Sequence, residues 1–138
     1  MADRNNHRVR RIHSDGIITT VVGVGEPDCC GDGGPAVEAM LNLPSDIALD
    51  VAGNLYISDR SNNRIRRVGL DGTITTVAGL RAPGYGGDYG PAEDALLKYP
   101  FGICLDREGN LYIADRGNNR VRKVDSRGII TTLAGDSA

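Results

Sequence analysis

The chain has 138 residues, the size of one globular domain, and its formal net charge of −2 argues against a general polyanion binder. No apolar run approaches the roughly 20 residues of a membrane span, and the N-terminal MADRNNHRVRRI lacks the apolar stretch of a signal peptide. The sequence therefore predicts a soluble protein without membrane contact, and it indicates no particular compartment. Its three cysteines follow no repeating pattern, so we expect neither a disulfide framework nor a CxxC-type zinc site, and no cofactor.

The N-terminal segment ADRNNHRVRRIHSDGIITTVVG (2–23) is the first of three near-copies. The others are SDRSNNRIRRVGLDGTITTVAG (58–79) and ADRGNNRVRKVDSRGIITTLAG (114–135). Equivalent aspartates stand 56 residues apart, at Asp3, Asp59 and Asp115 (59 − 3 and 115 − 59). Repeats of this length indicate a supersecondary unit that buries its apolar faces only by stacking on its own copies.

Within one repeat the pattern is that of four short strands. PSDIALD (44–50) and NLYISD (54–59) form one hairpin, while NRIRRV (63–68) and TITTVAG (73–79) form a second one around Asp71-Gly72. No helical period of any length is present. Four up-and-down strands per repeat predict the blade of a β-propeller.

A connector rich in glycine and proline (80–99) then leads to the next copy, with one helical turn expected after Pro91. The sequence thus predicts an all-β fold of four-stranded antiparallel meanders in a single domain, 1–138. We expect complete blades at 44–79 and 100–135. The segment 3–23 supplies only the third and fourth strands, a two-stranded half blade.

LPSDIALDVAGNLYISDRSNNRIRRV (43–68) and YPFGICLDREGNLYIADRGNNRVRKV (99–124) resemble the NHL repeat, and the resemblance covers essentially the whole chain. GDGGPA (31–36) and GDYGPA (87–92) are similar to the connector of long bacterial NHL repeats. The resemblance implies a propeller of about six blades. It implies little about activity, since NHL rings serve protein binding, RNA binding in some animal proteins, and a metal-dependent lyase.

A closed ring needs roughly four to eight blades, and two and a half blades leave apolar lateral faces open. We therefore predict self-association, or a fragment of a longer array. Three chains supply six complete blades, which favours a trimer slightly over a dimer, although the N-terminal strands of a trimer then compete with residues 119–135 of a neighbour.

The most polar feature is the repeated segment that begins at Asp59. Asp and Asn at a tight turn bond their own backbone, and an Asp followed five residues later by Arg pairs across the turn. We therefore interpret this segment as a structural motif rather than a binding loop. Its members are Asp59, Asn62 and Arg64 in one blade and Asp115, Asn118 and Arg120 in the next.

A basic stripe follows the third strand of each blade, where a rim of positive charge is suited to phosphates. The chain has no Trp and one Phe, so no aromatic platform for bases accompanies it. Solvated edge charges are the simpler interpretation, and nucleic-acid binding is the alternative that they leave open. The residues are Arg64, Arg66 and Arg67, with Arg120, Arg122 and Lys123 in the next blade.

Metal and catalytic sites have weaker support. The connectors offer Asp28, Asp32 and Asp88 as oxygen donors for calcium. Only one aspartate recurs per copy, whereas a calcium loop needs several at alternating spacing, so turn chemistry is preferred. His7 and His13 are the only histidines. A metal-dependent hydrolase or lyase remains an alternative only if the symmetry of an oligomer brings copies of Asp46 or Asp50 together into a ring of carboxylates. The sequence therefore predicts a non-catalytic scaffold for a protein or carbohydrate ligand, with no metal.

Overall fold

A computed structural model describes residues 1–136 and consists of three antiparallel sheets. Residues 137–138, which the predicted domain 1–138 includes, lie outside the described part. The strands are β1 (Ala2–Asp3), β2 (Arg8–Ile12), β3 (Ile18–Val22), β4 (Asp46–Leu49), β5 (Leu55–Asp59), β6 (Arg64–Val68), β7 (Ile74–Ala78), β8 (Ile103–Leu105), β9 (Leu111–Asp115), β10 (Arg120–Val124) and β11 (Ile130–Ala134). The predicted all-β fold of propeller blades is confirmed.

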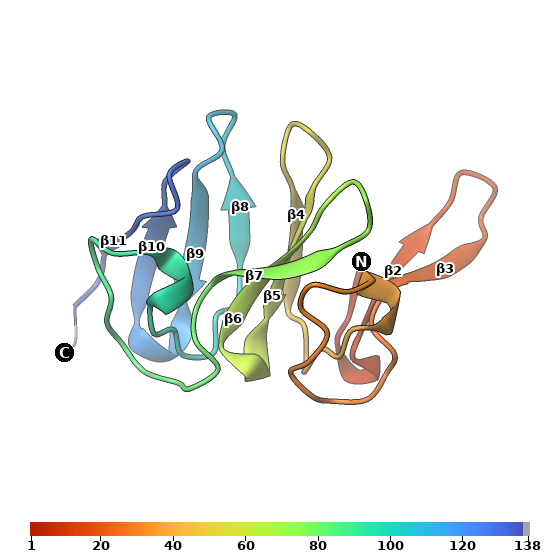
Figure 1. The fold of residues 1–138 in the computed structure, drawn as a ribbon, viewed down its shortest axis with the longest axis horizontal. Coiled ribbons are helices and arrows are strands. Elements are labelled where there is room, and N and C mark those ends of the chain that lie inside the picture. Colours follow the sequence, from red (N-terminus) through yellow and green to blue (C-terminus); the bar gives the residue numbers. More distant parts are fainter. Residues whose placement is uncertain (137–138) are drawn as a thin grey trace.

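The second and third sheets are four-stranded meanders in the orders β4-β5-β6-β7 and β8-β9-β10-β11. The three sheets stand side by side in chain order (Figure 1). Hairpin turns with glycine at positive φ join the strands, as at Gly72 (φ 84°), because an L side chain is disfavoured in that conformation. A bulge at Ile65/Arg66 displaces the register between β6 and β7, and the same bulge recurs at Val9/Arg10 and Val121/Arg122.

The N-terminal sheet has three strands, so the prediction of a two-stranded half blade is corrected. Ala2 and Asp3 pair with Val9 and Arg8. Two residues are too short for the alternating pattern by which a strand is recognised in a sequence, and only the pairing partner reveals them. This incomplete blade lacks the innermost strand.

Each connector crosses to the following blade and hydrogen-bonds to its outermost strand. Ile74 on β7 donates its amide to Gly34 O and accepts Gly33 N at 2.8 Å, and Ile130 on β11 pairs in the same way with residues 89–90. The predicted helical turn is confirmed after Pro91 as the 3-10 turn η4 (Ala92–Asp94), and η2 (Ala36–Glu38) is its equivalent. No connector lies along β3 within residues 1–136, and Ile18 is 46% exposed where Ile74 and Ile130 are fully buried.

The hydrophobic core lies between the blades. Val9 and Val22 pack toward Ile57 and Ile74 of the next sheet. One repeat later, Ile65 and Ala78 meet a cluster of the third sheet that includes Ile113, Val124 and Ile130. The middle blade, β4–β7, thus buries one face against the sheet before it and the other against the sheet after it. None of the helices in the described residues is both long and apolar enough to span a membrane.

Candidate functional site

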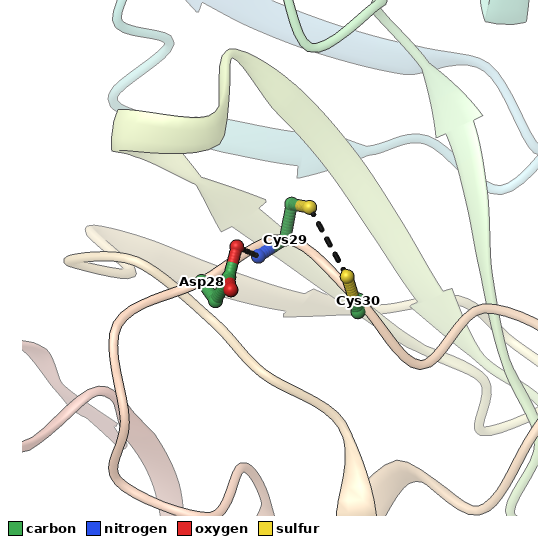
Figure 2. Close-up of side chains that lie close together, drawn as sticks. All are labelled: Asp28, Cys29 and Cys30. Carbon is green, nitrogen blue, oxygen red and sulfur yellow. Dashed lines mark hydrogen bonds between the residues drawn. The ribbon is translucent and has the colours of Figure 1, made fainter.

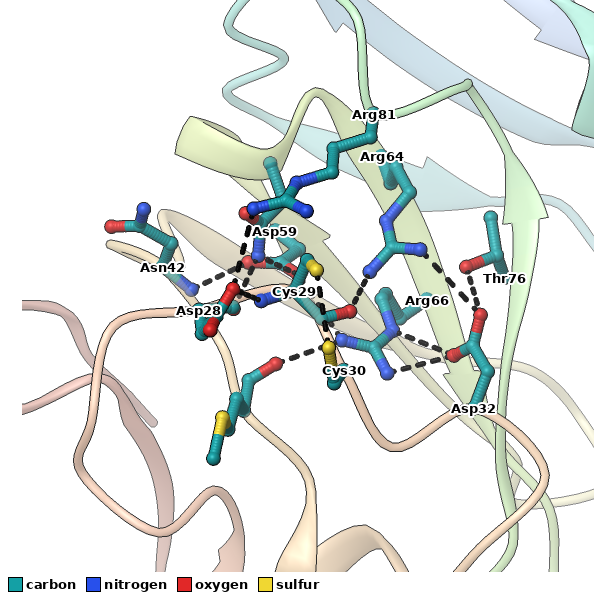
Figure 3. Close-up of polar contacts among 12 residues, drawn as sticks. Asp28, Cys29, Cys30, Asp32, Asn42, Asp59, Arg64, Arg66, Thr76 and Arg81 are labelled. Carbon is teal, nitrogen blue, oxygen red and sulfur yellow. Dashed lines mark hydrogen bonds and ion pairs between the residues drawn. The ribbon is translucent and has the colours of Figure 1, made fainter.

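Each complete blade contains a buried ion pair, near the turn that joins its second and third strands. Asp59 ends β5, Arg66 lies on β6, and both are fully buried, with 3.3 Å between Asp59 Oδ2 and Arg66 Nη1 (Figure 3). The short turn η3 (Arg60–Asn62) between the two strands places Asn62 so that its Nδ2 donates to the same carboxylate at 2.9 Å. The other oxygen, Oδ1, accepts the backbone N–H of Asn42 at 2.8 Å.

Arg66 also holds the connector that precedes its blade. Its Nε and Nη2 donate to Asp32 Oδ1 at 3.0 and 2.7 Å, and its Nη1 donates to Met40 O at 2.9 Å. Thr76 on β7 donates to Asp32 Oδ2 at 2.6 Å. The aspartate of the GDGGPA connector is therefore an anion partner of arginine, and its oxygens have their donors without a calcium ion.

The same network recurs in the third blade. Arg122 is fully buried between Asp115 (3.2 Å) and Asp88 (2.9 Å), and Asp115 accepts the backbone N–H of Lys98 at 2.8 Å. In the N-terminal copy the pair Asp3 and Arg10 is longer, at 3.6 Å, and both side chains are about one quarter exposed. Arg10 Nε is buried and has no hydrogen-bond partner among residues 1–136, where Arg66 Nε has Asp32.

The expected pairs of Asp59 with Arg64 and of Asp115 with Arg120 are wrong. Arg64 donates to Cys29 O and lies 3.6 Å from Asp32, while the guanidinium of Arg120 covers the ring of Tyr85 at 3.6 Å. Asp59 stands opposite Arg64 in the strand register. The carboxylate of Asp59 pairs instead with Arg66. Arg66 is the next arginine on the same face of β6, because strand side chains alternate with period two.

The asparagines of the motif lie in the short turns Arg60–Asn62 and Arg116–Asn118. Asn62 and Asn118 bond the motif aspartates and the carbonyls of Asp28 and Gly84. The residue after each turn is left-handed, and in the first two sheets it binds the entrance to the following blade. Asn63 Oδ1 accepts the amide of Tyr99, and His7 Nδ1 accepts that of Leu43. His7 thus replaces an asparagine at a structural position.

The basic stripe does not form a continuous exposed band. Arg66 and Arg122 are fully buried, which contradicts solvated edge charges at these two positions. Arg64, Arg67, Arg120 and Lys123 are partly buried. Of the candidate ring carboxylates, Asp46 accepts the amide of Ile103 and its repeat equivalent is Gly102, while Asp50 binds Asn54 within a hairpin turn.

A cluster that the sequence analysis left without a role lies beside this network. Cys29 and Cys30 are free thiols with their Sγ atoms 3.3 Å apart, and Asp28 lies next to them (Figure 2). The hydrogen bond with Cys30, followed by burial, raises the pKa of the Cys29 thiol. Arg64 and Arg81 point toward the same segment, on Cys29 O and Asp28 Oδ1.

We expect the free energy of unfolding to fall as the pH drops through the ordinary range of aspartate carboxyls. Six carboxyls have a folded pKa below their ordinary value, so in this range the unfolded chain binds more protons, and their contribution is lost on acidification. Burial raises the pKa of Asp59, although hydrogen bonds from Asn42, Asn62 and Arg66 lower it. Asp59 is therefore the one carboxyl among these whose contribution to stability increases on acidification. The six are Asp28, Asp50, Asp71, Asp88, Asp106 and Asp125.

Urea unfolding at pH 3 and pH 7 measures this difference. The side-chain hydrogen bond from Asn110 holds the pKa of Asp106 below its usual value, so Asp106→Asn should reduce the loss between the two pH values. Higher stability at pH 3 than at pH 7 would contradict the assignment.

Stacked antiparallel meanders, each closed by a buried Asp–Arg pair and joined by a Gly-rich connector, define the chain as part of an NHL-repeat propeller. The family described as teneurin NHL domain matches residues 24–84 and 82–138, and the chain belongs to that family.

Curated relatives include mouse teneurin-3, 37% identical over 102 residues and 64% of this chain. Drosophila melanogaster teneurin-m is 33% identical over 142 residues and 93% of this chain. The chain spans only 4% and 5% of the length of these two relatives. The similarity therefore concerns one domain of much larger proteins.

Solved structures show the same fold. A Bacteroides thetaiotaomicron protein of unknown function has a TM-score of 0.80 at 29% identity over 96% of this chain and 32% of its own. Virginiamycin B lyase from Staphylococcus aureus has a TM-score of 0.61 at 21% identity over 99% of this chain and 38% of its own. At that identity the likeness to the lyase shows the fold alone.

Proposed function

We propose that this chain is a non-catalytic interaction scaffold whose propeller is completed by self-association. The observation that carries the proposal is that positions buried between blades inside the chain are exposed at its two ends. Val121 on β10 is 39% exposed, whereas its repeat equivalents Ile65 and Val9 are at most 1% exposed. At the other end Ile12 is 62% exposed, whereas its repeat equivalents Val68 and Val124 are partly buried and buried, respectively.

A second copy of this chain fits both ends. The free face of the third blade is the repeat equivalent of the face by which the second blade packs on the third, and the free face of the N-terminal sheet is equivalent to the matching partner surface. The two open surfaces lie at opposite ends of the row of sheets (Figure 1). Head-to-tail contact between copies therefore repeats the sheet-on-sheet part of a packing that the chain already makes twice.

A ring of two chains accounts for the expected number of blades better than a ring of three chains. The N-terminal sheet packs in its own blade position against the second blade, so one chain occupies three positions rather than two. Two chains then occupy six positions, the ring size that the NHL resemblance implies. We accordingly propose a two-chain ring in place of the trimer that the strand count alone favours.

Light scattering tests this proposal. We expect twice the chain mass of 14.7 kDa at micromolar concentration. Val121→Glu should dissociate the assembly, because it places a charge in the apolar contact. Val51→Glu is the matched control, since Val51 lies in a hairpin turn and is 79% exposed.

A concentration-independent mass of one chain would contradict self-association, and a mass of three chains would contradict the two-chain ring. Equal effects of the two glutamate substitutions would show that the end of the third blade is not the contact. An activity abolished by a chelator would instead support a metal-dependent enzyme at the channel.

A further inference from the structure

The two connectors are nearly equivalent in structure, but their sequences differ at many positions, and one run of three differences changes the chemistry of the segment. Asp28, Cys29 and Cys30 stand where the next repeat has Gly84, Tyr85 and Gly86. Tyr85 is used structurally, because its ring stacks under Arg120 and its hydroxyl donates to Asp88. The first connector replaces this aromatic contact by two thiols and a carboxylate, which makes the segment specific to one blade.

The backbone of this segment is fixed at every residue. Asn62 Nδ2 donates to Asp28 O at 2.7 Å, Arg64 donates to Cys29 O, and the backbone amide of Met40 donates to Cys30 O at 2.9 Å. These donors belong to the second blade and to the return of the connector, and Figure 3 shows one of them, Arg64, beside the cysteines. The side chains of the segment are therefore presented from a rigid support.

The potential ligand atoms of the three side chains lie close together. One carboxylate oxygen of Asp28 and the two sulfur atoms lie within 4.8 Å of one another, and the sulfurs are 3.3 Å apart (Figure 2). A tetrahedral ion with sulfur ligands at about 2.3 Å separates two sulfurs by about 3.8 Å. Cys30 is exposed, so a small side-chain rotation supplies the difference.

The two thiols are unsuited to bonding with each other. Consecutive Cα atoms are about 3.8 Å apart across a trans peptide, whereas disulfides usually join Cα atoms about 4.4–6.8 Å apart. The described residues contain no cis peptide bond. Both cysteines consequently remain available as thiolate ligands.

We propose that Asp28, Cys29 and Cys30 form a binding site for a thiophilic divalent cation of the zinc type. Two thiolates and one carboxylate provide three ligands and leave the fourth position open to water or to a ligand group. Arg81 holds the Asp28 carboxylate at 3.3 Å, but both side chains are about half exposed or more, so the ion displaces a weak contact. This site is independent of how the ring is completed.

Cadmium titration of the reduced full chain, without oxygen, tests the site through the ultraviolet charge-transfer absorption of cadmium thiolates. We expect one equivalent of Cd²⁺ per chain. Cys29→Ser and Cys30→Ser should each abolish the stoichiometric absorption, while Cys104→Ser, which removes an exposed cysteine on β8, should leave it unchanged. Asp28→Asn should weaken affinity by at least about tenfold, since losing an outer-shell partner alone costs about 10–100-fold.

Circular dichroism establishes whether each variant is folded. If Cys29→Ser does not fold, the result for Cys30→Ser alone tests the proposal. Binding that survives Cys30→Ser, no stoichiometric binding by the unaltered protein, or a Cys29–Cys30 disulfide in the protein as purified would each overturn the proposal. One ion per two chains would also overturn it, because the three ligands come from one chain.

Discussion

Asp59→Ala is expected to lower the free energy of unfolding by about 3–5 kcal/mol, the cost of removing one partner from a buried ion pair. Arg66 is fully buried, and Asp32 alone then remains to balance its charge. The substitution also leaves the amide of Asn42 without its acceptor at the entrance to β4. Chemical denaturation with urea measures the change.

Asp3→Ala is the matched control within the same chain. Asp3 occupies the equivalent position of the incomplete blade, but its side chain is one quarter exposed and its distance to Arg10 is 3.6 Å. A partly exposed ion pair of this kind contributes about 1 kcal/mol or less to the free energy of unfolding. Equal losses from the two substitutions would show that burial by the connector does not determine the strength of the pair.

Local chemistry accounts for the parts of the fold that the sequence predicts well. The hairpin around Asp71-Gly72 and the β-branched TITTVAG are signals carried by adjacent residues, and β6 and β7 form where these signals place them. The 3-10 turn after Pro91 is predicted for the same reason, since proline fixes its own φ.

The partner of each buried arginine could not be predicted in this way. Arg64 and Arg66 share one face of β6, and the sequence does not show which of them the connector covers. Asp32 lies 34 residues before Arg66 and reaches it only because the preceding connector folds across the blade. A contact set by tertiary packing leaves no local pattern to read.

The cysteine cluster was missed for a related reason. Adjacent cysteines match no metal-binding spacing, so no known motif points to them. Their significance depends on Asn62 and Arg64, whose side chains fix the backbone beneath them. The departure of this connector from its copy was visible in the sequence, and comparison of the two connectors position by position is the signal that could have found the cluster.

Ile74→Ala is expected to cost about 2–5 kcal/mol, because it opens a cavity at a fully buried position beneath the connector. Ile18→Ala, at the repeat-equivalent position, should cost about 0.5 kcal/mol in a single chain, as surface substitutions usually do. Both are best measured by urea unfolding in the Val121→Glu background, where the chain is expected to stay single. The contrast depends on the environment alone, since both changes remove the same atoms from the outermost strand of a blade.

In the associating protein, without Val121→Glu, the substitution Ile18→Ala should cost more than it does in the single chain. Head-to-tail association places the third blade of one copy against the N-terminal sheet of the other, where Ile18 and Ile12 are exposed in the single chain. Ile18→Ala should then weaken association, detected as a rise in the concentration at which light scattering reports dimers. A large loss from Ile18→Ala in the Val121→Glu background would contradict this, because the edge of β3 would already be covered in the single chain.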